Sequence, residues 1–243
     1  LDDVAGVIQG QLAEISAASA IRPGASIAVG VGSRGIDQLE TIVRAVVADI
    51  KTRGGKPFIF PAMGSHGGAT AEGQEKVLAD YGITAKRVGA PVRAAMETIA
   101  AARLPDGTEL HADRLAAEAD GIVLINRIKP HSTFRGVYQS GLLKMLVIGM
   151  GKVAGATIMH QHYGMARFGE ILPTAGAALL TQLPVLYGVA LVEDAADQTA
   201  VAEVVPAAEF VAREPDLLRF AEESMGRLYF EQIDVVVIDQ IGK

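Results

Sequence analysis

Continuous apolar runs that alternate with amphipathic segments are the feature that most constrains the fold of this chain. The runs have the length of buried strands, and they span 27–31, 56–60, 121–126, 185–192 and 233–238. Helical patterns lie between them, over 36–50, 70–81, 114–119, 166–183 and 207–229. Strands that are apolar along their whole length are typical of a parallel sheet covered on both faces. The alternation therefore predicts an α/β fold of three layers, with helices on both faces of a mostly parallel sheet.

Local signals support several of these boundaries. Apolar residues recur on one face of the helix over 36–50, and Gly54-Gly55 is a typical helix end. Thr70 has the side chain of an N-cap for the helix over 70–81. An Asp-Gly pair at 106–107 predicts the turn of a hairpin.

Composition excludes several classes of protein and of site. The 243 residues include no cysteine, which removes disulfides, thiolate nucleophiles and cysteine-ligated metals. A net charge of −6 without a basic cluster argues against nucleic acid as a partner. No apolar run approaches the ~20 residues of a membrane span, and the first residues do not open a signal peptide. We therefore expect a cytoplasmic protein with neither a nucleic-acid nor a membrane partner.

The loop over 30–35 has the G-x-G-x-x-G spacing of a dinucleotide loop, at the sheet edge where parallel α/β proteins bind ligands. The next strand ends at 60–63 without the acid that would bind ribose hydroxyls, so we expect a Rossmann-like but not dinucleotide-binding fold. Backbone N–H groups at a helix start, with Ser33 and Arg34 beside Gly32, still favour a phosphate. The alternative is a tight turn with an exposed arginine.

Two histidines follow strand ends and are candidates for proton transfer. His66 stands in the glycine-rich loop over 63–70, and His131 follows Pro130 in the loop that begins at Asn126. An accessible imidazole titrates near neutral pH and can act as an acid or a base. If both lie in one cleft, they form a pair of proton-transfer groups. The alternative for each is a plain hydrogen-bonding role in a loop.

Lys144 lies in the most hydrophobic part of segment 131–160, with no carboxylate among the seven residues on either side. Burial lowers the pKa of an amine and makes it nucleophilic, so Lys144 is a candidate for covalent attachment or for a Schiff base. The alternative is a stem packed on apolar surface with its ammonium in water. Lys152 competes for either role, although Gly149-Met150-Gly151 before it is typical of a loop.

His160, with His162 close by, is a candidate metal ligand because imidazole suits nickel, copper, zinc or iron. The chain has no cysteine and no H-x-x-x-H or H-E-x-x-H spacing, so the sequence gives little support for a metal held by protein groups alone. A structural role is the alternative for both histidines.

Four segments together resemble the nickel-pincer lactate racemase family, over most of the chain. Gly32-Ser33-Arg34 resembles the family's phosphate loop, and Gly64-Ser65-His66 resembles its Gly-Thr-His catalytic segment. The stretch from Ala119-Asp120 to Pro130-His131 resembles the strand that ends in Pro-His. Ser140-Gly141-Leu142-Leu143-Lys144, followed sixteen residues later by His160, resembles the lysine segment and its metal histidine.

Three positions depart from the family pattern. Leu142 stands where glycine is usual, and Ile148 and Gly35 stand where proline is usual. The attachment lysine, the metal histidine and the catalytic histidines of the pattern are all present. The departures therefore bear on the substrate more than on the cofactor.

The resemblance implies an isomerase, a racemase or epimerase of a 2-hydroxy acid that works by reversible hydride transfer. His66 and His131 would be the catalytic pair. The turn Gly32-Ser33-Arg34 would bind the phosphate of a pyridinium-3,5-bisthiocarboxylic acid mononucleotide, the nickel-pincer nucleotide. Lys144 would be joined to this cofactor through an amide, and His160 would be the protein ligand of its nickel. Cofactor-maturation proteins would be partners.

The resemblance also implies that residues 1–243 are the amino-terminal, catalytic and cofactor-binding domain of a longer protein. The chain opens without methionine, and residues 238–243 resemble the join to a second domain in relatives, so we expect a second α/β domain beyond this chain. Two other interpretations stay open. One is a phosphate-binding α/β enzyme with Lys144 as a Schiff-base nucleophile, and the other is a non-catalytic ligand-binding relative.

Overall fold

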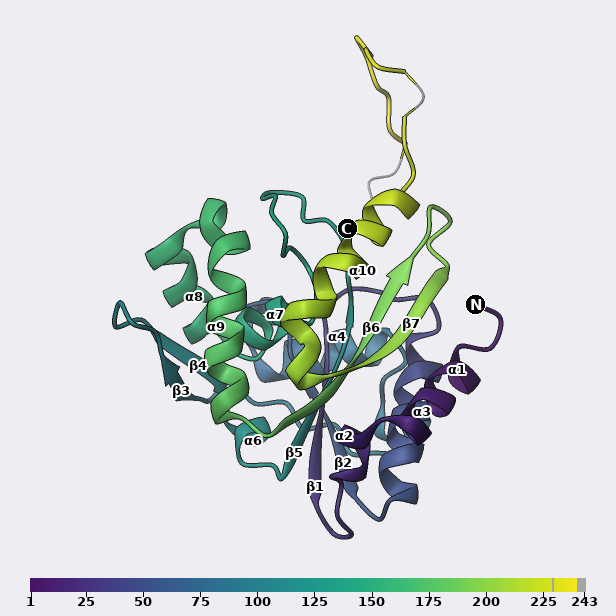
Figure 1. Cartoon of the computed structure of the whole chain (residues 1–243), viewed down its shortest axis with the longest axis vertical. Coiled ribbons are helices and arrows are strands. Elements are labelled where there is room, and N and C mark those ends of the chain that lie inside the picture. The colour runs from purple at the N-terminus through teal and green to yellow at the C-terminus, as the bar shows by residue number, and fades with distance from the viewer. Residues whose placement is uncertain (229, 240–243) are drawn as a thin grey trace.

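The computed structural model describes residues 1–228 and 230–239, and its centre is a five-stranded sheet (Figure 1). The strands lie in the order β2-β1-β5-β6-β7, and all neighbours are parallel except β6 and β7. Their bounds are β1 Ser26–Val31, β2 Lys56–Pro61, β5 Gly121–Arg127, β6 Val185–Glu193 and β7 Thr199–Pro206. The expectation of a mostly parallel α/β sheet is confirmed.

Side chains along the central strands alternate between two hydrophobic cores. In β1, Ala28 packs in one core, and Val29 packs in the other. In β5, Leu124 and Val123 divide in the same way. Successive residues of a strand point to opposite faces, so both faces of this sheet are apolar and both need cover. Helices lie on each side of the sheet (Figure 1), which confirms the three-layer expectation.

One face is covered by elements from the amino-terminal part of the chain. Helix α1 (Val4–Glu14) packs on α3 (Leu39–Thr52), and buried Leu12 and Ile42 belong to the same core. The shorter elements of this layer are α2 Ser16–Ser19, η1 Gly67–Ala69, α4 Ala71–Asp80 and α5 Ala85–Val88. The Thr70 hydroxyl accepts the Gly73 N–H at 3.0 Å, so the predicted N-cap of α4 is confirmed.

The opposite face carries a hairpin and the carboxy-terminal helices. Strands β3 (Thr98–Arg103) and β4 (Glu109–Asp113) are antiparallel, as the Asp-Gly turn predicts. The helical elements of this layer are α6 Arg114–Ala117, α7 Leu142–Lys144, η2 Met145–Gly149, α8 Lys152–Tyr163, η3 Met165–Arg167, α9 Phe168–Gln182, η4 Ala207–Glu209 and α10 Phe210–Ser224.

The polypeptide bends sharply in the segment that contains Lys144. Helix α7 runs into the π-helical turn η2, and α8 then leaves at 102° to the first arm. Lys152 is the first residue of α8 and has φ 52°, so the expected loop ends before this lysine. Within the described part of the chain, no single helix is long and apolar enough to cross a membrane, although the two arms of this bend meet that criterion when taken together.

Strand β7 is absent from the sequence expectation because its pattern is that of an edge strand. Among the described strands it pairs only with β6, to which it is antiparallel, and buried and partly exposed residues are mixed along both of its faces. Glu203 in its middle is partly exposed and binds the guanidinium of Arg213 on α10. A continuous apolar run is therefore not required there.

The predicted strand over 233–238 is wrong, because these described residues form no strand. Val235 and Val237 are 79% and 85% exposed, and the chain after α10 rises away from the body (Figure 1). A strand needs a neighbour to satisfy its backbone N–H and C=O groups, and the segment pairs with no strand among the described residues. The helix predicted over 207–229 ends at Ser224; residue 229, and residues 240–243 of the expected join, lie outside the described residues.

Candidate active site

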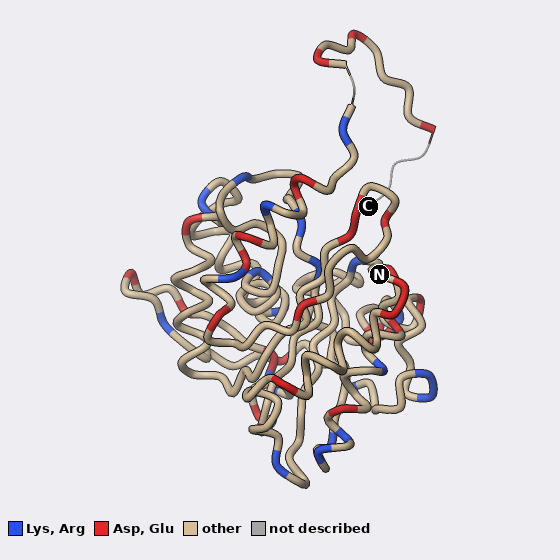
Figure 2. The backbone as a smooth tube through the Cα atoms, turned by 45° about the vertical axis from the view of Figure 1, so that its right-hand side comes forward, with Lys and Arg blue, Asp and Glu red and all other residues tan. Residues whose placement is uncertain are grey.

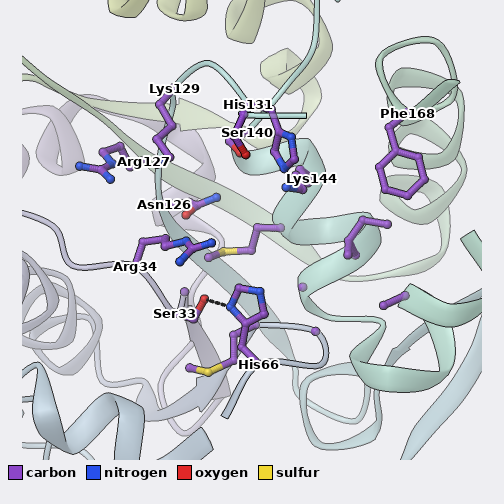
Figure 3. A pocket seen from close by; sticks show the side chains of 18 of the residues that line it. Ser33, Arg34, His66, Asn126, Arg127, Lys129, His131, Ser140, Lys144 and Phe168 are labelled. Carbon is purple, nitrogen blue, oxygen red and sulfur yellow. Dashed lines mark hydrogen bonds between the residues drawn. The ribbon is translucent and has the colours of Figure 1, made fainter. Parts of the chain in front are cut away.

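A pocket of about 590 Å³ opens where β1, β2 and β5 end. It brings together the side chains that the sequence places on four separate segments (Figure 3). All the predicted site residues line it: Gly32, Ser33, Arg34, His66, His131, Lys144 and His160. Parallel strands end at one edge of the sheet, so the loops that follow them converge. The chemical roles of these residues remain predictions.

The turn after β1 holds Ser33 against the first histidine. The Ser33 hydroxyl is hydrogen-bonded to Nδ1 of His66, and the Tyr81 hydroxyl donates to the Ser33 carbonyl at 3.0 Å. A side chain at Gly32 would crowd the pocket floor, because its Cβ would lie 3.3 Å from the Asn126 amide oxygen. Helix α3 does not begin at this turn but at Leu39, so the expected helix start is not available to an anion here. Attraction for an anion rests on the arginine and on the backbone of the turn.

The loop after β2 that carries His66 is fastened from behind by buried polar groups. Gln74 donates from Nε2 to the carbonyl oxygens of Gly64 and His66, at 2.8 and 3.2 Å. Its Oε1 accepts from the Lys152 ammonium at 3.0 Å, and that ammonium lies 3.1 Å from Asp113 Oδ2. Gln74, Lys152 and Asp113 are each 0% exposed.

Lys152 therefore has a structural partner that the sequence did not reveal. Its ammonium also donates to the Pro61 carbonyl, at the end of β2. Asp113 lies 39 positions earlier on β4, where its other oxygen caps α6 by accepting the Ala116 N–H at 3.0 Å. No local spacing links two residues so far apart. Of the two lysines that the sequence left in competition, Lys144 lines the pocket and Lys152 does not, and the functional role of Lys144 stays a prediction.

His131 is held as a neutral imidazole at the other end of the pocket. Its backbone N–H donates to Gln139 Oε1 at 2.7 Å, and its ring stacks on Phe134 with centroids 4.3 Å apart. Burial, and then the charges of Lys144 and Lys129, lower the pKa of His131 to about 4. The Thr133 N–H donates to Nδ1 at 3.1 Å, so the proton of the neutral ring lies on Nε2.

Lys144 ends helix α7 with its ammonium inside the pocket, 5.8 Å from the centre of the Phe134 ring. Burial, and then the charges of Arg34 and Lys129, lower the pKa of Lys144 to about 8. More of this amine is unprotonated at neutral pH than of an ordinary lysine, so it is a better nucleophile.

Glu214 of α10 holds the start of the helix that ends in Lys144. Its carboxylate accepts the Leu143 N–H at 3.0 Å and is fully buried. A Cβ at Gly141 would lie 2.5 Å from the Glu214 carboxyl carbon, so the glycine is needed for this contact. Burial raises the pKa of Glu214 to about 7, although the N–H donors oppose this shift.

His160 projects from α8 with one ring nitrogen already used. Its Nδ1 donates to the Ala156 carbonyl at 2.5 Å, and its ring packs edge-on against Phe168 with centroids 4.9 Å apart. A metal-binding histidine usually donates its other ring N–H to a carbonyl or carboxylate in this way, which leaves the Nε2 lone pair available. Within the described residues no group of three or more His, Asp or Glu side chains could hold a metal.

The pocket is strongly cationic, although over the whole chain Lys and Arg are interspersed with Asp and Glu (Figure 2). No Asp or Glu is among the described residues that line it. Its cationic lining residues are Arg34, Arg127, Lys129, Arg135 and Lys144. Three of these were not singled out from the sequence. Position in the sequence could have identified two of them, because Arg127 and Lys129 directly follow the apolar part of a strand, at the edge of the sheet where ligands bind.

The family described as the lactate racemase N-terminal domain matches residues 10–170, which include all the predicted site residues. This chain belongs to that family. The comparison with curated proteins gives no match.

The lactate racemase N-terminal domain of this chain has a counterpart among solved structures. The lactate racemase apoprotein from Thermoanaerobacterium thermosaccharolyticum is similar, with a TM-score of 0.64 and 16% identity. The likeness covers 82% of this chain and 50% of that chain, so this chain spans about half the length of the solved protein. At this identity the likeness concerns the fold.

One departure from the lactate racemase pattern has a visible packing reason. Leu142 is buried between α7 and the sheet, and a Cβ at Gly188 of β6 would lie 2.7 Å from its side chain. The bulk at 142 is thus matched by a missing side chain on the strand that it covers. Ile148 lies in the π-helical turn and lines the pocket, where it adds apolar surface beside Gly64.

Proposed function

We propose that this lactate racemase N-terminal domain is the cofactor-carrying part of an isomerase, a racemase or epimerase of a 2-hydroxy acid. The observation that carries the proposal is that one cationic pocket is lined by a nucleophilic lysine, by three histidines and by the arginine of the turn Gly32-Ser33-Arg34, which we call the anion turn. These side chains are Lys144, His66, His131, His160 and Arg34. The reaction would proceed by reversible hydride transfer. Because the chain spans about half of the solved lactate racemase, we propose that a second α/β domain completes the enzyme.

The side chains of the pocket fit a nickel-pincer mononucleotide. Lys144 offers an amine whose lowered pKa favours acylation, and an amide would remove the charge that burial opposes. His160 offers one nitrogen and belongs to no group of three or more potential protein ligands among the described residues, which suits a metal whose other ligands are the sulfur and carbon of the cofactor. Arg34 and Ser33 would bind its phosphate. When bound, the cofactor supplies a soft metal centre and a carbon that accepts hydride.

The two histidines are suited to move the hydroxyl proton of the substrate. They enter the pocket from different elements, His66 from the loop after β2 and His131 from the loop after β5 (Figure 3). In its neutral form His131 can donate a hydrogen bond from Nε2–H to the substrate, and it would act as the acid only after it has bound a second proton and become an imidazolium. The Ser33 hydroxyl fixes the orientation of His66, which we assign as the base. A racemase must run from both substrate enantiomers, and the two rings would exchange these roles in the reverse direction.

The test is to co-express the full-length protein with cofactor-maturation proteins, which we propose as its partners. We expect a stable mass increase on Lys144, located by peptide mass spectrometry, bound nickel, and interconversion of the enantiomers of at least one 2-hydroxy acid in a chiral assay. Lys144→Arg should abolish the adduct. His160→Ala should retain the adduct and lose the nickel.

Three results would contradict this proposal in different ways. Loaded protein that interconverts no hydroxy acid in a broad panel would indicate a non-catalytic relative. Borohydride trapping of a carbonyl compound on Lys144 would favour the Schiff-base enzyme. Persistent failure to form the adduct, with the maturation proteins active on another racemase in the same cells, would exclude the cofactor.

A further inference from the structure

The pocket contains more cationic side chains than the proposed cofactor uses. Arg34 belongs to the anion turn, and Lys144 is the attachment point. Arg127 is paired with Glu193, which is nearly buried. Arg135 donates to backbone carbonyl oxygens of its own loop. The remaining cation has none of these assignments.

That cation is Lys129. Its ammonium has no hydrogen-bond or ion-pair partner among residues 1–228 and 230–239, although its side chain is half-buried. Burial, and then the charges of Arg127 and Arg34, lower the pKa of Lys129, although the charge of Asp197 opposes this shift. A half-buried ammonium among other cations is stabilised when an anion binds next to it.

The backbone presents Lys129 rigidly. Its N–H donates to the Ser140 carbonyl at 2.9 Å, and its carbonyl accepts the Ser140 N–H at 3.2 Å. The residue before a proline is restricted to extended conformations, and Pro130 follows. In an extended segment, residues two apart leave from the same side, so Lys129 and His131 both enter the pocket. Both lie along the same rim in Figure 3.

Lys129 and His131 line the same pocket, and the charge of Lys129 acts on the His131 ring. A 2-hydroxy acid has its hydroxyl on the carbon next to its carboxylate, so it offers an anionic group and a neighbouring hydroxyl to these two side chains. A carboxylate bound to Lys129 would therefore place the adjacent hydroxyl toward the ring of His131. We propose that Lys129 binds the carboxylate of the substrate and orients its 2-hydroxyl toward His131. This inference rests on the proposed function, and it restricts the substrate to free acids. Esters and amides of the same hydroxy acids would bind weakly.

The experiment compares a free acid with its uncharged analogue. Binding of ¹³C-labelled lactate and lactamide to the cofactor-free chain is measured by NMR titration for the wild type and for Lys129→Met, Lys129→Arg and Lys56→Met. Methionine keeps the stem and removes the charge, and arginine keeps the charge. Lys56 is an exposed lysine at the opposite end of β2 and is the matched control.

We expect the wild type and Lys56→Met to prefer lactate over lactamide. Lys129→Met should bind lactate about 10- to 100-fold more weakly, the range for loss of one charge-assisted hydrogen bond, and should no longer discriminate. Lys129→Arg should recover part of the preference. In the loaded full-length enzyme, the same methionine variant should raise KM with the adduct on Lys144 and the nickel content unchanged.

Undiminished lactate preference in Lys129→Met, or no lactate binding by the folded wild-type chain, would overturn the assignment. These outcomes are distinguishable from failure of the proposed function. A wild-type enzyme that binds lactate through Lys129 but racemises nothing would contradict the reaction and leave the carboxylate site intact. Circular dichroism of every variant checks that the fold is retained.

Discussion

Replacement of Lys152 by methionine tests the buried network behind the His66 loop. The ammonium is 0% exposed, and it contacts Asp113 Oδ2, Gln74 Oε1 and the Pro61 carbonyl. Methionine fills a similar volume, so the main loss is electrostatic: the Asp113 carboxylate stays buried without its cation. Removal of one partner of a buried ion pair costs about 3–5 kcal/mol. With a urea m-value of about 3 kcal/mol/M, that loss lowers the unfolding midpoint by about 1–2 M.

A double variant separates charge from packing. In Lys152→Met with Asp113→Asn, the uncompensated charge is gone, while the asparagine oxygen can still cap α6. We expect the double variant to be more stable than Lys152→Met alone, with a coupling free energy of about 1–3 kcal/mol in urea unfolding followed by circular dichroism. A loss below about 1 kcal/mol in the single variant, or a double variant no better than the single one, would refute the assignment of this network as a compensated buried pair.

Three further predictions concern the titration of groups around the pocket. Burial raises the pKa of Glu214 to about 7, so its contribution to stability is present below its unfolded pKa of about 4.5 and is lost as the pH rises through 7. The free energy of unfolding of Glu214→Gln, measured in urea, should therefore increase relative to that of the wild type by up to about 3 kcal/mol between pH 4.5 and 8. A difference between the two proteins that does not depend on pH would contradict this. The imidazole C–H signals of His131 should titrate near pH 4, and Lys129→Met should move that midpoint upward because one neighbouring cation is removed. The rate of acetylation of Lys144, followed by peptide mass spectrometry, should reach half its maximum near pH 8, and a profile like that of exposed lysines would show that burial does not act on this amine.

The sequence was most informative where a local pattern reports burial. The apolar runs at 27–31 and 121–126 are covered on both faces, so their composition alone indicates central parallel strands. Thr70 and the Asp-Gly turn are likewise local signals with local consequences. The convergence of the predicted site residues on one pocket follows from the parallel sheet, because its topology brings strand ends together.

What the sequence could not show depends on partners that are remote in the chain. The run at 233–238 has the composition of a strand, but a strand exists only beside a neighbour. Lys152 and Lys144 both stand among apolar residues, and only the fold reveals that one meets Asp113 while the other meets an open pocket. Lys129 was passed over for the same reason: the lack of a counter-ion is a property of the surroundings, not of the residue.

The 102° bend after η2 gives a geometric meaning to the interval between Lys144 and His160. On one straight helix, sixteen residues would separate these two positions by about 24 Å along the helix axis. Because of the bend, the two arms turn toward each other, and the Lys144 amine and the His160 imidazole line the same pocket. One residue added to or removed from the second arm would rotate the imidazole by about 100° around its helix and turn it away. The number of residues in that arm is therefore constrained, in addition to the identity of buried residues such as Lys152 at its start.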